Sequence, residues 1–302
     1  MLPPLRRFLL LVLLASIPPA VLGAQSRGQG DRPAFPAADR GVLLLAHGGG
    51  PGWNAQVEAV AREVRHAGPV AVSFLVGPGA EAAPFQEVVA GLVARGAREV
   101  VVVPVLISSH SGHYEQVRWL AGTVDTLEPM MAHHLELGGI RRPRPGVPIR
   151  VTPALDDAPE MARLLAARAR ALDPDTSRAL LLLGHGPNSA EDYAEWMGNL
   201  RRVAEEVRRL AGYRSVLVEL VRDDAAPTVR AEAVARVGDL IRLQAALTGR
   251  DVLVVPVLVA TGRVSREKFA GDLDGLPVDY RGDALLPDPS LARWVERRVG
   301  EM

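Results

Sequence analysis

The chain has 302 residues, of which 48% are hydrophobic, so it can form one large hydrophobic core or two smaller ones. Its 35 basic and 35 acidic side chains cancel, which gives no general electrostatic reason to expect nucleic acid or an anionic membrane as a partner. The sequence contains no cysteine, which excludes disulfides, thiolate metal ligands and a lipid anchor attached through cysteine.

The first residues have the three-part pattern of a secretory signal peptide. Arg6 and Arg7 precede an apolar run over residues 8–17, and small residues follow the two prolines that end this run. The run is too short to span a bilayer about 30 Å thick, so we expect removal of residues 1–24 and no stable membrane span. Residues 25–39, rich in Gly, Pro and Ala, predict a linker. The mature protein is therefore expected in the periplasm or outside the cell.

Strands and helices are predicted to alternate from residue 41 onward. The apolar run 42–46 leads into His47 and three glycines, a pattern typical of a buried strand in a parallel sheet. Apolar residues at helical spacing, and the Gly and Pro residues that interrupt the pattern, give the other elements. The predicted strands are 70–76, 99–107, 149–153, 179–183, 215–221 and 251–259; the predicted helices are 54–66, 85–95, 158–171, 191–211 and 227–247; segment 127–148 is predicted to be irregular.

The second half of the sequence repeats the first. ALLLLGHG ends with His185 in the place of His47, and DVLVVPVLV matches EVVVVPVLI with Pro256 opposite Pro104. This duplication predicts an α/β fold of two similar lobes, residues 40–173 and 174–302, each a small parallel sheet wrapped by helices. Because proline cannot donate to a sheet ladder, we expect an edge position or a bulge at both prolines.

Three segments, present in the same order in both halves, resemble the sirohydrochlorin chelatase family. They are the LLLxxHG opening, the valine-rich strand with its proline and following loop, and the closing segment that begins PALDD in the first half. These class II chelatases, relatives of ferrochelatase, insert cobalt or iron into a tetrapyrrole. The resemblance implies two flavodoxin-like lobes with the active site between them. It implies a tetrapyrrole and a divalent metal (Co²⁺, Fe²⁺ or Ni²⁺) as ligands, no organic cofactor and no nucleic acid, and leaves a homodimer open.

The resemblance also implies metal-handling histidines after the first strand and in the loop after the third. His47 matches the first of these. His113 is the candidate for the second, with His110 as the substitute, because the loop PVLISSHSGH places His113 one residue later than the family pattern. Neutral imidazole binds first-row metal ions and can accept a proton from a pyrrole near neutral pH. Glu115 is a candidate to orient an imidazole or relay protons.

The second half departs from the family pattern at two points. Val264 stands where the second histidine is expected, and Arg222 stands where many relatives carry an acidic residue after the second strand. Val76 takes the corresponding acidic position in the first half. Arginines at the rim of the cleft would bind the carboxylates of the substrate. The candidates for substrate binding are His185, Arg222, Arg263, Ser108 and Ser109.

Two other functions are compatible with parts of the sequence. An exported metal- or haem-binding protein that kept the chelatase fold and lost turnover is favoured by the signal peptide and by the departures just described. A secreted esterase would account for HGGG at 47–50, a phrase found in the oxyanion hole of α/β-hydrolases. That fold also needs a G-x-S-x-G nucleophile elbow, which this sequence lacks.

Overall fold

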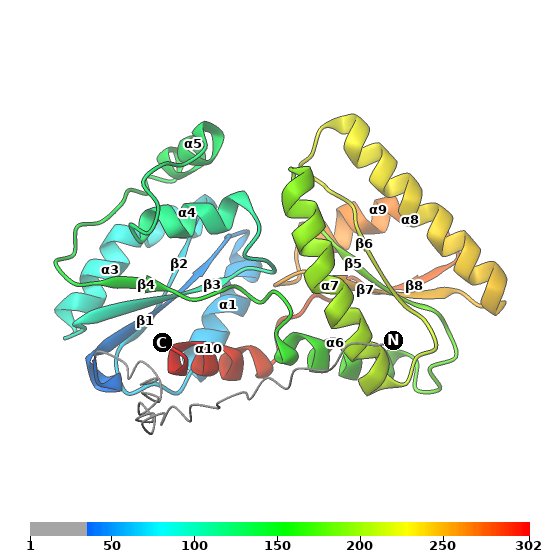
Figure 1. Cartoon of the computed structure of the whole chain (residues 1–302), viewed down its shortest axis with the longest axis horizontal. Helices are drawn as coiled ribbons and strands as arrows, with labels where there is room; N and C mark the ends of the chain where they lie inside the picture. The colour runs from blue at the N-terminus through cyan, green and yellow to red at the C-terminus, as the bar shows by residue number, and fades with distance from the viewer. Residues whose placement is uncertain (1–34) are drawn as a thin grey trace, which may run out of the picture. The chain divides into compact units, whose positions relative to one another are not determined.

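Two four-stranded parallel sheets organise residues 35–302, the part of the chain that this computed structural model describes (Figure 1). The predicted signal peptide and most of the predicted linker lie outside the described residues. Lobe 1 contains the sheet β2-β1-β3-β4, and lobe 2 contains the sheet β6-β5-β7-β8. The strands are β1 (Arg40–Ala46), β2 (Val70–Phe74), β3 (Glu99–Val105), β4 (Ile149–Val151), β5 (Leu180–Gly184), β6 (Val216–Leu220), β7 (Val252–Val257) and β8 (Val278–Tyr280).

Helices connect successive parallel strands in both lobes, as crossover connections require. None of the helices in the described part of the chain is long and apolar enough to cross a membrane. The helices are α1 (Pro51–Glu63), α2 (Gly77–Ala82), α3 (Phe85–Ala94), α4 (Gly112–Leu120), α5 (Pro129–Leu137), α6 (Pro159–Leu172), α7 (Ala190–Ala211), α8 (Pro227–Thr248), α9 (Phe269–Asp272) and α10 (Ser290–Gly300), with short η1 (Ala37–Asp39) and η2 (Val264–Lys268).

The first strand of each lobe lies at the centre of its sheet. All of the residues of β1 and β5 are buried, and each strand is paired on both sides. A strand with sheet on both edges and helices on both faces must be apolar throughout, which is why GVLLLA and LLLLG lack the alternation of a half-exposed strand. The sequence prediction of a duplicated α/β unit is confirmed by this identical strand order.

The two strand prolines lie in unbroken register. Pro104 is opposite Leu45 and Pro256 is opposite Leu183, with one residue facing one residue throughout, so the expected bulge is absent. The outer strands β4 and β8 end their pairing two residues earlier, at Val102 and Val254 respectively. Residues two apart point to the same edge of a strand, so each proline nitrogen faces an edge that is no longer paired.

Segment 127–148, predicted to be irregular, contains α5. Pro129 occupies the first turn, where its missing N–H costs no hydrogen bond. The Glu128 carboxylate caps the helix by accepting from the backbone N–H of Met131 at 3.1 Å. The sequence prediction failed here because the cap is a Glu and because the nine residues of α5 show little apolar periodicity.

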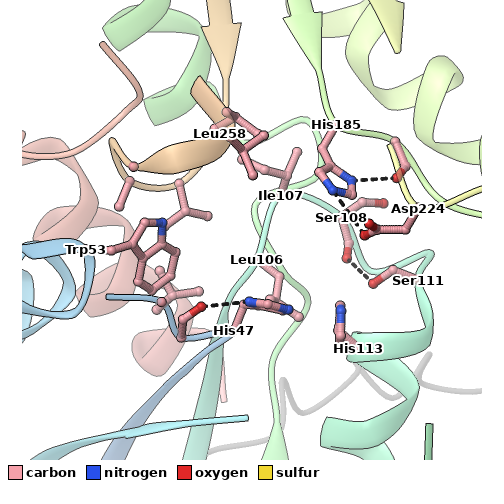
Figure 2. Close-up of a pocket in the computed structure, with 18 of the residues that line it drawn as sticks. His47, Trp53, Leu106, Ile107, Ser108, Ser111, His113, His185, Asp224 and Leu258 are labelled. Carbon is pink, nitrogen blue, oxygen red and sulfur yellow. Dashed lines mark hydrogen bonds and ion pairs between the residues drawn. The ribbon is translucent and has the colours of Figure 1, made fainter. Parts of the chain in front are cut away.

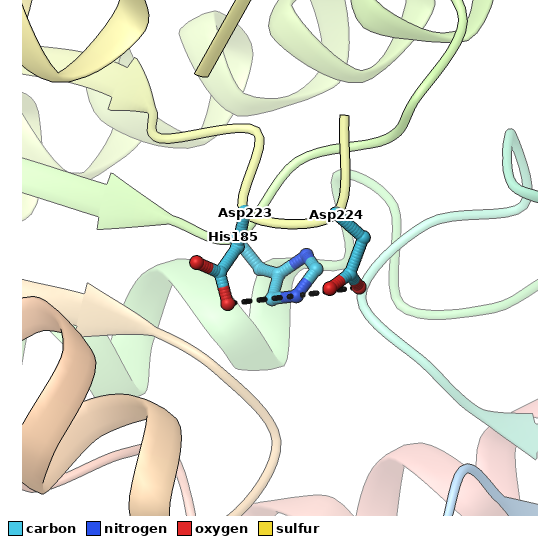
Figure 3. A group of neighbouring side chains, drawn as sticks. All are labelled: His185, Asp223 and Asp224. Carbon is cyan, nitrogen blue, oxygen red and sulfur yellow. Dashed lines mark ion pairs between the residues drawn. The ribbon is translucent and has the colours of Figure 1, made fainter. Parts of the chain in front are cut away.

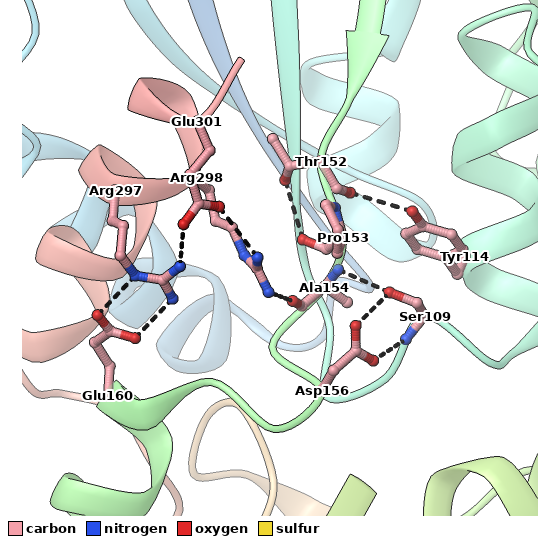
Figure 4. Close-up of polar contacts among 10 residues, drawn as sticks. All are labelled: Ser109, Tyr114, Thr152, Pro153, Ala154, Asp156, Glu160, Arg297, Arg298 and Glu301. Atoms are coloured by element: carbon pink, nitrogen blue, oxygen red, sulfur yellow. Dashed lines mark hydrogen bonds and ion pairs between the residues drawn. The ribbon is translucent and has the colours of Figure 1, made fainter. Parts of the chain in front are cut away.

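Each lobe is completed by a helix from the other half of the sequence. α6 follows β4 in the chain but packs against α7 and β7 of lobe 2, whereas α10 packs against α1 and β3 of lobe 1. Arg297 on α10 donates to both carboxylate oxygens of Glu160 on α6, at 3.0 and 2.8 Å (Figure 4). Segments 40–173 and 174–302 therefore carry one sheet each, but each ends on a helix that covers the other lobe.

Helix α1 also joins the lobes beside their carboxyl edges. The Gln56 amide accepts from the backbone N–H of Thr261 at 3.1 Å and donates to its carbonyl at 3.0 Å. Trp53 packs so closely against Gly262 that a Cβ built there would lie 2.9 Å from the indole ring. A larger residue at position 262 would push α1 away from the loop that follows β7.

Candidate metal centre

A cleft of about 1650 Å³ lies between the carboxyl ends of the two sheets (Figure 2). Its walls come from the segments that follow β1, β3, β5 and β7, which is where ligands bind in open α/β sheets. Pockets for ordinary small molecules are about 300–1,000 Å³, so this cleft has room for a larger ligand.

His47 and His113 meet in lobe 1 at the wall of this cleft. His47 follows β1 directly, and His113 lies in the first turn of α4, after β3. Their ring centres are 4.5 Å apart and their planes are nearly perpendicular, at 79°. An imidazole that binds a first-row metal at about 2.1 Å has its ring centre about 3.2 Å from the ion, so two such ligands at a right angle have centres about 4.5 Å apart. The observed separation therefore suits two ligands of one ion.

The hydrogen bonds of these two rings leave the same nitrogen free. His47 Nδ1 donates to the Gly48 carbonyl at 2.8 Å, because a carbonyl can only accept. His113 Nδ1 lies 2.8 Å from Oε1 of Gln116. With a proton on Nδ1, a neutral ring carries its lone pair on Nε2, the nitrogen with which it can bind a metal ion.

Burial keeps both imidazoles of lobe 1 neutral. It is the main cause that lowers the pKa of His47, with the charge of His185 as a further contribution. Burial, followed by the proximity of His47, lowers the pKa of His113 to about 4. Neutral rings at physiological pH are ready to bind a cation without first losing a proton.

His185 occupies the corresponding position in lobe 2 but has a different environment (Figure 3). Its Nδ1 donates to the Gly186 carbonyl at 2.9 Å, repeating the contact that His47 makes. Its Nε2 lies 3.2 Å from Asp224 and 3.8 Å from Asp223. Burial lowers the pKa of His185, but the hydrogen bond and charge of Asp224 outweigh it and the pKa is raised. The same contact lowers the pKa of Asp224 to about 2.

Asp223 is already neutralised by two cations. Its side chain is almost fully buried and contacts Lys268 and, at 3.1 Å, Arg230. His185, Asp223 and Asp224 are close enough to hold one metal ion. The cations beside Asp223 nevertheless repel a metal ion, and the contributions that raise the pKa of His185 come chiefly from Asp224.

The structure places the other predicted residues at different distances from the cleft. Ser108 and Arg263 line it, as does Glu115, whose carboxylate pairs with Arg118 at 2.9 Å rather than with His113. Gln116, the next residue, contacts the His113 imidazole instead, so Glu115 does not orient this ring in the structure. His110, the substitute ligand, does not line the cleft.

Two other candidates for substrate binding also lie away from the cleft lining. Ser109 donates to Asp156 at 2.7 Å and so braces the loop after β4 (Figure 4). Arg222 has a positive φ of 52°, and its guanidinium stacks on Tyr193 at 5.1 Å and donates to two loop carbonyls. These contacts occupy both side chains with structural roles.

Sequence reasoning missed Gln116, Asp223 and Asp224. A signal for the aspartates was present, because they follow directly after Arg222, the position where the family resemblance led us to expect an acid. The left-handed backbone at Arg222 displaces the acidic function by one or two residues. Gln116 carries no motif signal of its own.

Fold and site together define a class: duplicated two-lobed α/β proteins with a histidine-lined cleft between the lobes. The CbiX family model matches residues 41–172, which span the sheet of lobe 1 and α6. No curated protein sequence matches the chain significantly.

Solved structures match both lobes. SirB from Bacillus subtilis with Fe³⁺ superposes with a TM-score of 0.57 at 17% identity, covering 87% of this chain and 95% of that one. The sirohydrochlorin chelatase SirB from Bacillus subtilis subspecies spizizenii in complex with cobalt gives 0.56 at 17% identity, covering 87% and 94%. A multi-domain protein from Deinococcus radiodurans with structural similarity to chelatases gives 0.52 at 20% identity, covering 86% and 54%. The chelatase-like fold is thus confirmed, and the CbiX family model bears out the family resemblance over residues 41–172.

Proposed function

We propose that this protein is a chelatase that inserts a divalent metal ion into a tetrapyrrole of the sirohydrochlorin type. The observation that carries the proposal is the pair of neutral imidazoles, His47 and His113, with ring centres 4.5 Å apart at the wall of a large cleft. Nitrogen ligands suit Co²⁺, Fe²⁺ and Ni²⁺. The solved SirB structures that share this fold contain Fe³⁺ or cobalt, which supports a metal of this kind as the substrate.

Two protein ligands suit a metal ion that must be transferred to the macrocycle. An ion held by two imidazoles keeps several coordination positions for water and then for the pyrrole nitrogens. Insertion releases two N–H protons from the macrocycle. Because the pKa of His113 lies at about 4, this ring is a ligand rather than a lasting proton store. The released protons therefore pass on to solvent.

The basic side chains of lobe 2 supply sites for the carboxylates of the macrocycle. Arg263 and Arg266 line the cleft from lobe 2, whereas His47 and His113 line it from lobe 1. Arginine binds carboxylate with two parallel hydrogen bonds, which fixes the orientation of a ligand as well as its position. The ring would lie between these cations and the metal-holding imidazoles.

Metal insertion followed by absorption spectroscopy tests this proposal. Purified protein with sirohydrochlorin and Co²⁺ should produce the spectrum of the metallated ring faster than the uncatalysed mixture. His47→Ala and His113→Ala should each lower this rate by at least tenfold, whereas His133→Ala, on the exposed side of α5, should leave it unchanged. A wild-type rate equal to the uncatalysed rate would overturn the proposal.

A second candidate is an exported metal- or tetrapyrrole-binding protein without turnover. The signal-peptide pattern at the N-terminus favours it, as do Val76 and Val264 at positions where the family carries an acid and a histidine. The same assay separates the candidates, because binding of Co²⁺ and of the macrocycle without product would favour this one. We propose the periplasm or the exterior as its location in either case, and the mass of the secreted mature chain tests this.

A further inference from the structure

A buried glutamine connects the candidate metal centre to α5. Gln116 has no exposed surface, and its amide lies between two different segments. Oε1 is 2.8 Å from Nδ1 of His113, and Nε2 donates to the Met131 carbonyl at 2.8 Å. Met131 lies in α5 and, together with Met130, lines the cleft. One side chain thus touches both a candidate ligand and a helix at the wall of the cleft.

The Met131 carbonyl determines which way the amide of Gln116 faces. A carbonyl oxygen only accepts, so the NH₂ end must point to Met131 and the oxygen end to His113. That oxygen also only accepts, so the neutral His113 ring must carry its proton on Nδ1. Its lone pair is then on Nε2. Without a partner at Nδ1 the proton could move to Nε2, where it would compete with a metal ion.

The two candidate ligands differ in what holds them. His47 is fixed by the carbonyl of the next residue, a local contact that depends on no other element. His113 is fixed through Gln116 to a residue of another helix. α5 also packs directly on the start of α4, where a Cβ built on Gly112 would lie 2.6 Å from the Met131 sulfur. Any displacement of α5 therefore reaches His113 through both contacts.

We propose that Gln116 is a positioning residue that keeps the Nε2 lone pair of His113 available to the metal and ties this ring to the position of α5. The inference rests on the proposed function in one respect, that His113 is a metal ligand. Partners that hold the second nitrogen of a metal-binding histidine commonly change metal affinity by 10–100-fold when they are removed. Here that partner is a neutral amide rather than a carboxylate.

Two substitutions separate the two contacts of Gln116. Gln116→Met keeps the length of the side chain and loses both hydrogen bonds. Gln116→Glu keeps an acceptor for Nδ1–H but has no donor for the Met131 carbonyl. Gln86→Met is the matched control, because Gln86 also bridges two backbone groups, donating to Gly139 at 3.0 Å and accepting from Arg141 at 3.2 Å, on α3.

The first measurement uses metal-free protein at pH 8 and reads the ¹⁵N shifts of His113 by NMR. Wild type, Gln116→Glu and Gln86→Met should all show Nδ1–H, whereas Gln116→Met should show a population of Nε2–H. In Gln116→Glu the amides of α5 should exchange with solvent faster than in wild type, because the anchor at Met131 is lost. A wild-type ring with its proton on Nε2 would overturn the proposal even if no variant folded.

The second measurement is the dissociation constant for Co²⁺. We expect about tenfold weaker binding in Gln116→Met, a change within about threefold in Gln116→Glu, and no change in the control. A Gln116→Met variant with the wild-type tautomer and affinity would refute the positioning role. If His113→Ala bound Co²⁺ as tightly as wild type, the proposed function would fail at this ligand, and the tautomer measurement would still decide what Gln116 does.

Discussion

The low pKa of His113 predicts an unusual pH dependence of metal binding. An imidazole with the ordinary pKa of 6.5 loses about tenfold in metal affinity between pH 7.5 and pH 5.5, because protons occupy the ligand nitrogen. Two such ligands would lose about a hundredfold. His113, with a pKa of about 4, is only about 3% protonated at pH 5.5 and should contribute no loss. His47, whose pKa is also lowered, should contribute a loss of less than tenfold.

Isothermal titration with Co²⁺ at several pH values checks this, with circular dichroism at each pH to show that the protein remains folded. Wild type should lose at most about tenfold in affinity from pH 7.5 to pH 5.5. In His47→Ala the weaker remaining binding should be nearly independent of pH, and in His113→Ala it should keep the dependence of His47. A hundredfold loss in wild type would refute the argument that burial keeps both rings free of protons.

Three further predictions concern the lobe 2 histidine, a glycine turn and the contact between lobes. Asp224→Asn should move the pKa of His185 from above 6.5 to below 6.5 in an NMR titration. In wild type the raised pKa of His185 stabilises the fold below pH 6.5, and this stabilisation is lost as the pH rises through the pKa that His185 has in the folded protein. Gly48→Ala should cost about 2–4 kcal/mol in urea unfolding, because φ is +98° and the new Cβ would clash with the carbonyl oxygen of Val76. Gly50→Ala meets open space and should cost less than about 1 kcal/mol. Gln56→Ala should cost about 1–3 kcal/mol in the same assay through the loss of two backbone hydrogen bonds to lobe 2; an unchanged urea midpoint would contradict this.

The sequence predicted the sheets and the two imidazoles because both depend on local pattern. A continuous apolar run that ends in His47 and glycines identifies a central strand and its carboxyl end. The orienting residue could not be predicted in the same way. Residues three apart lie on the same face of a helix, whereas residues two apart do not, so Gln116 reaches His113 and Glu115 does not once α4 begins at Gly112. The sequence does not fix that starting point to one residue.

Contacts between segments distant in sequence were also beyond prediction. Nothing in the pattern around Arg222 indicates a left-handed backbone, a conformation that non-glycine residues rarely adopt. With this backbone the Arg222 side chain stacks on Tyr193 and Asp224 contacts His185. The periodicity of α6 and α10 predicted helices with one apolar face, but not which sheet that face would cover. That choice depends on the packing of the whole molecule.

The exchange of α6 and α10 means that neither half of this chain is a self-sufficient unit. A cut after residue 173 would leave the first half with α6 exposed, because the lobe 2 elements on which α6 packs belong to the other piece. The sheet of lobe 1 would also lose α10, whose Trp294 is fully buried in the intact chain. Each large apolar side chain uncovered in this way forfeits about 1.5–3 kcal/mol. A half-length protein with the same fold could bury these side chains by packing its last helix on the sheet of a second copy of itself. In this chain the covalent link between the halves makes that second copy unnecessary.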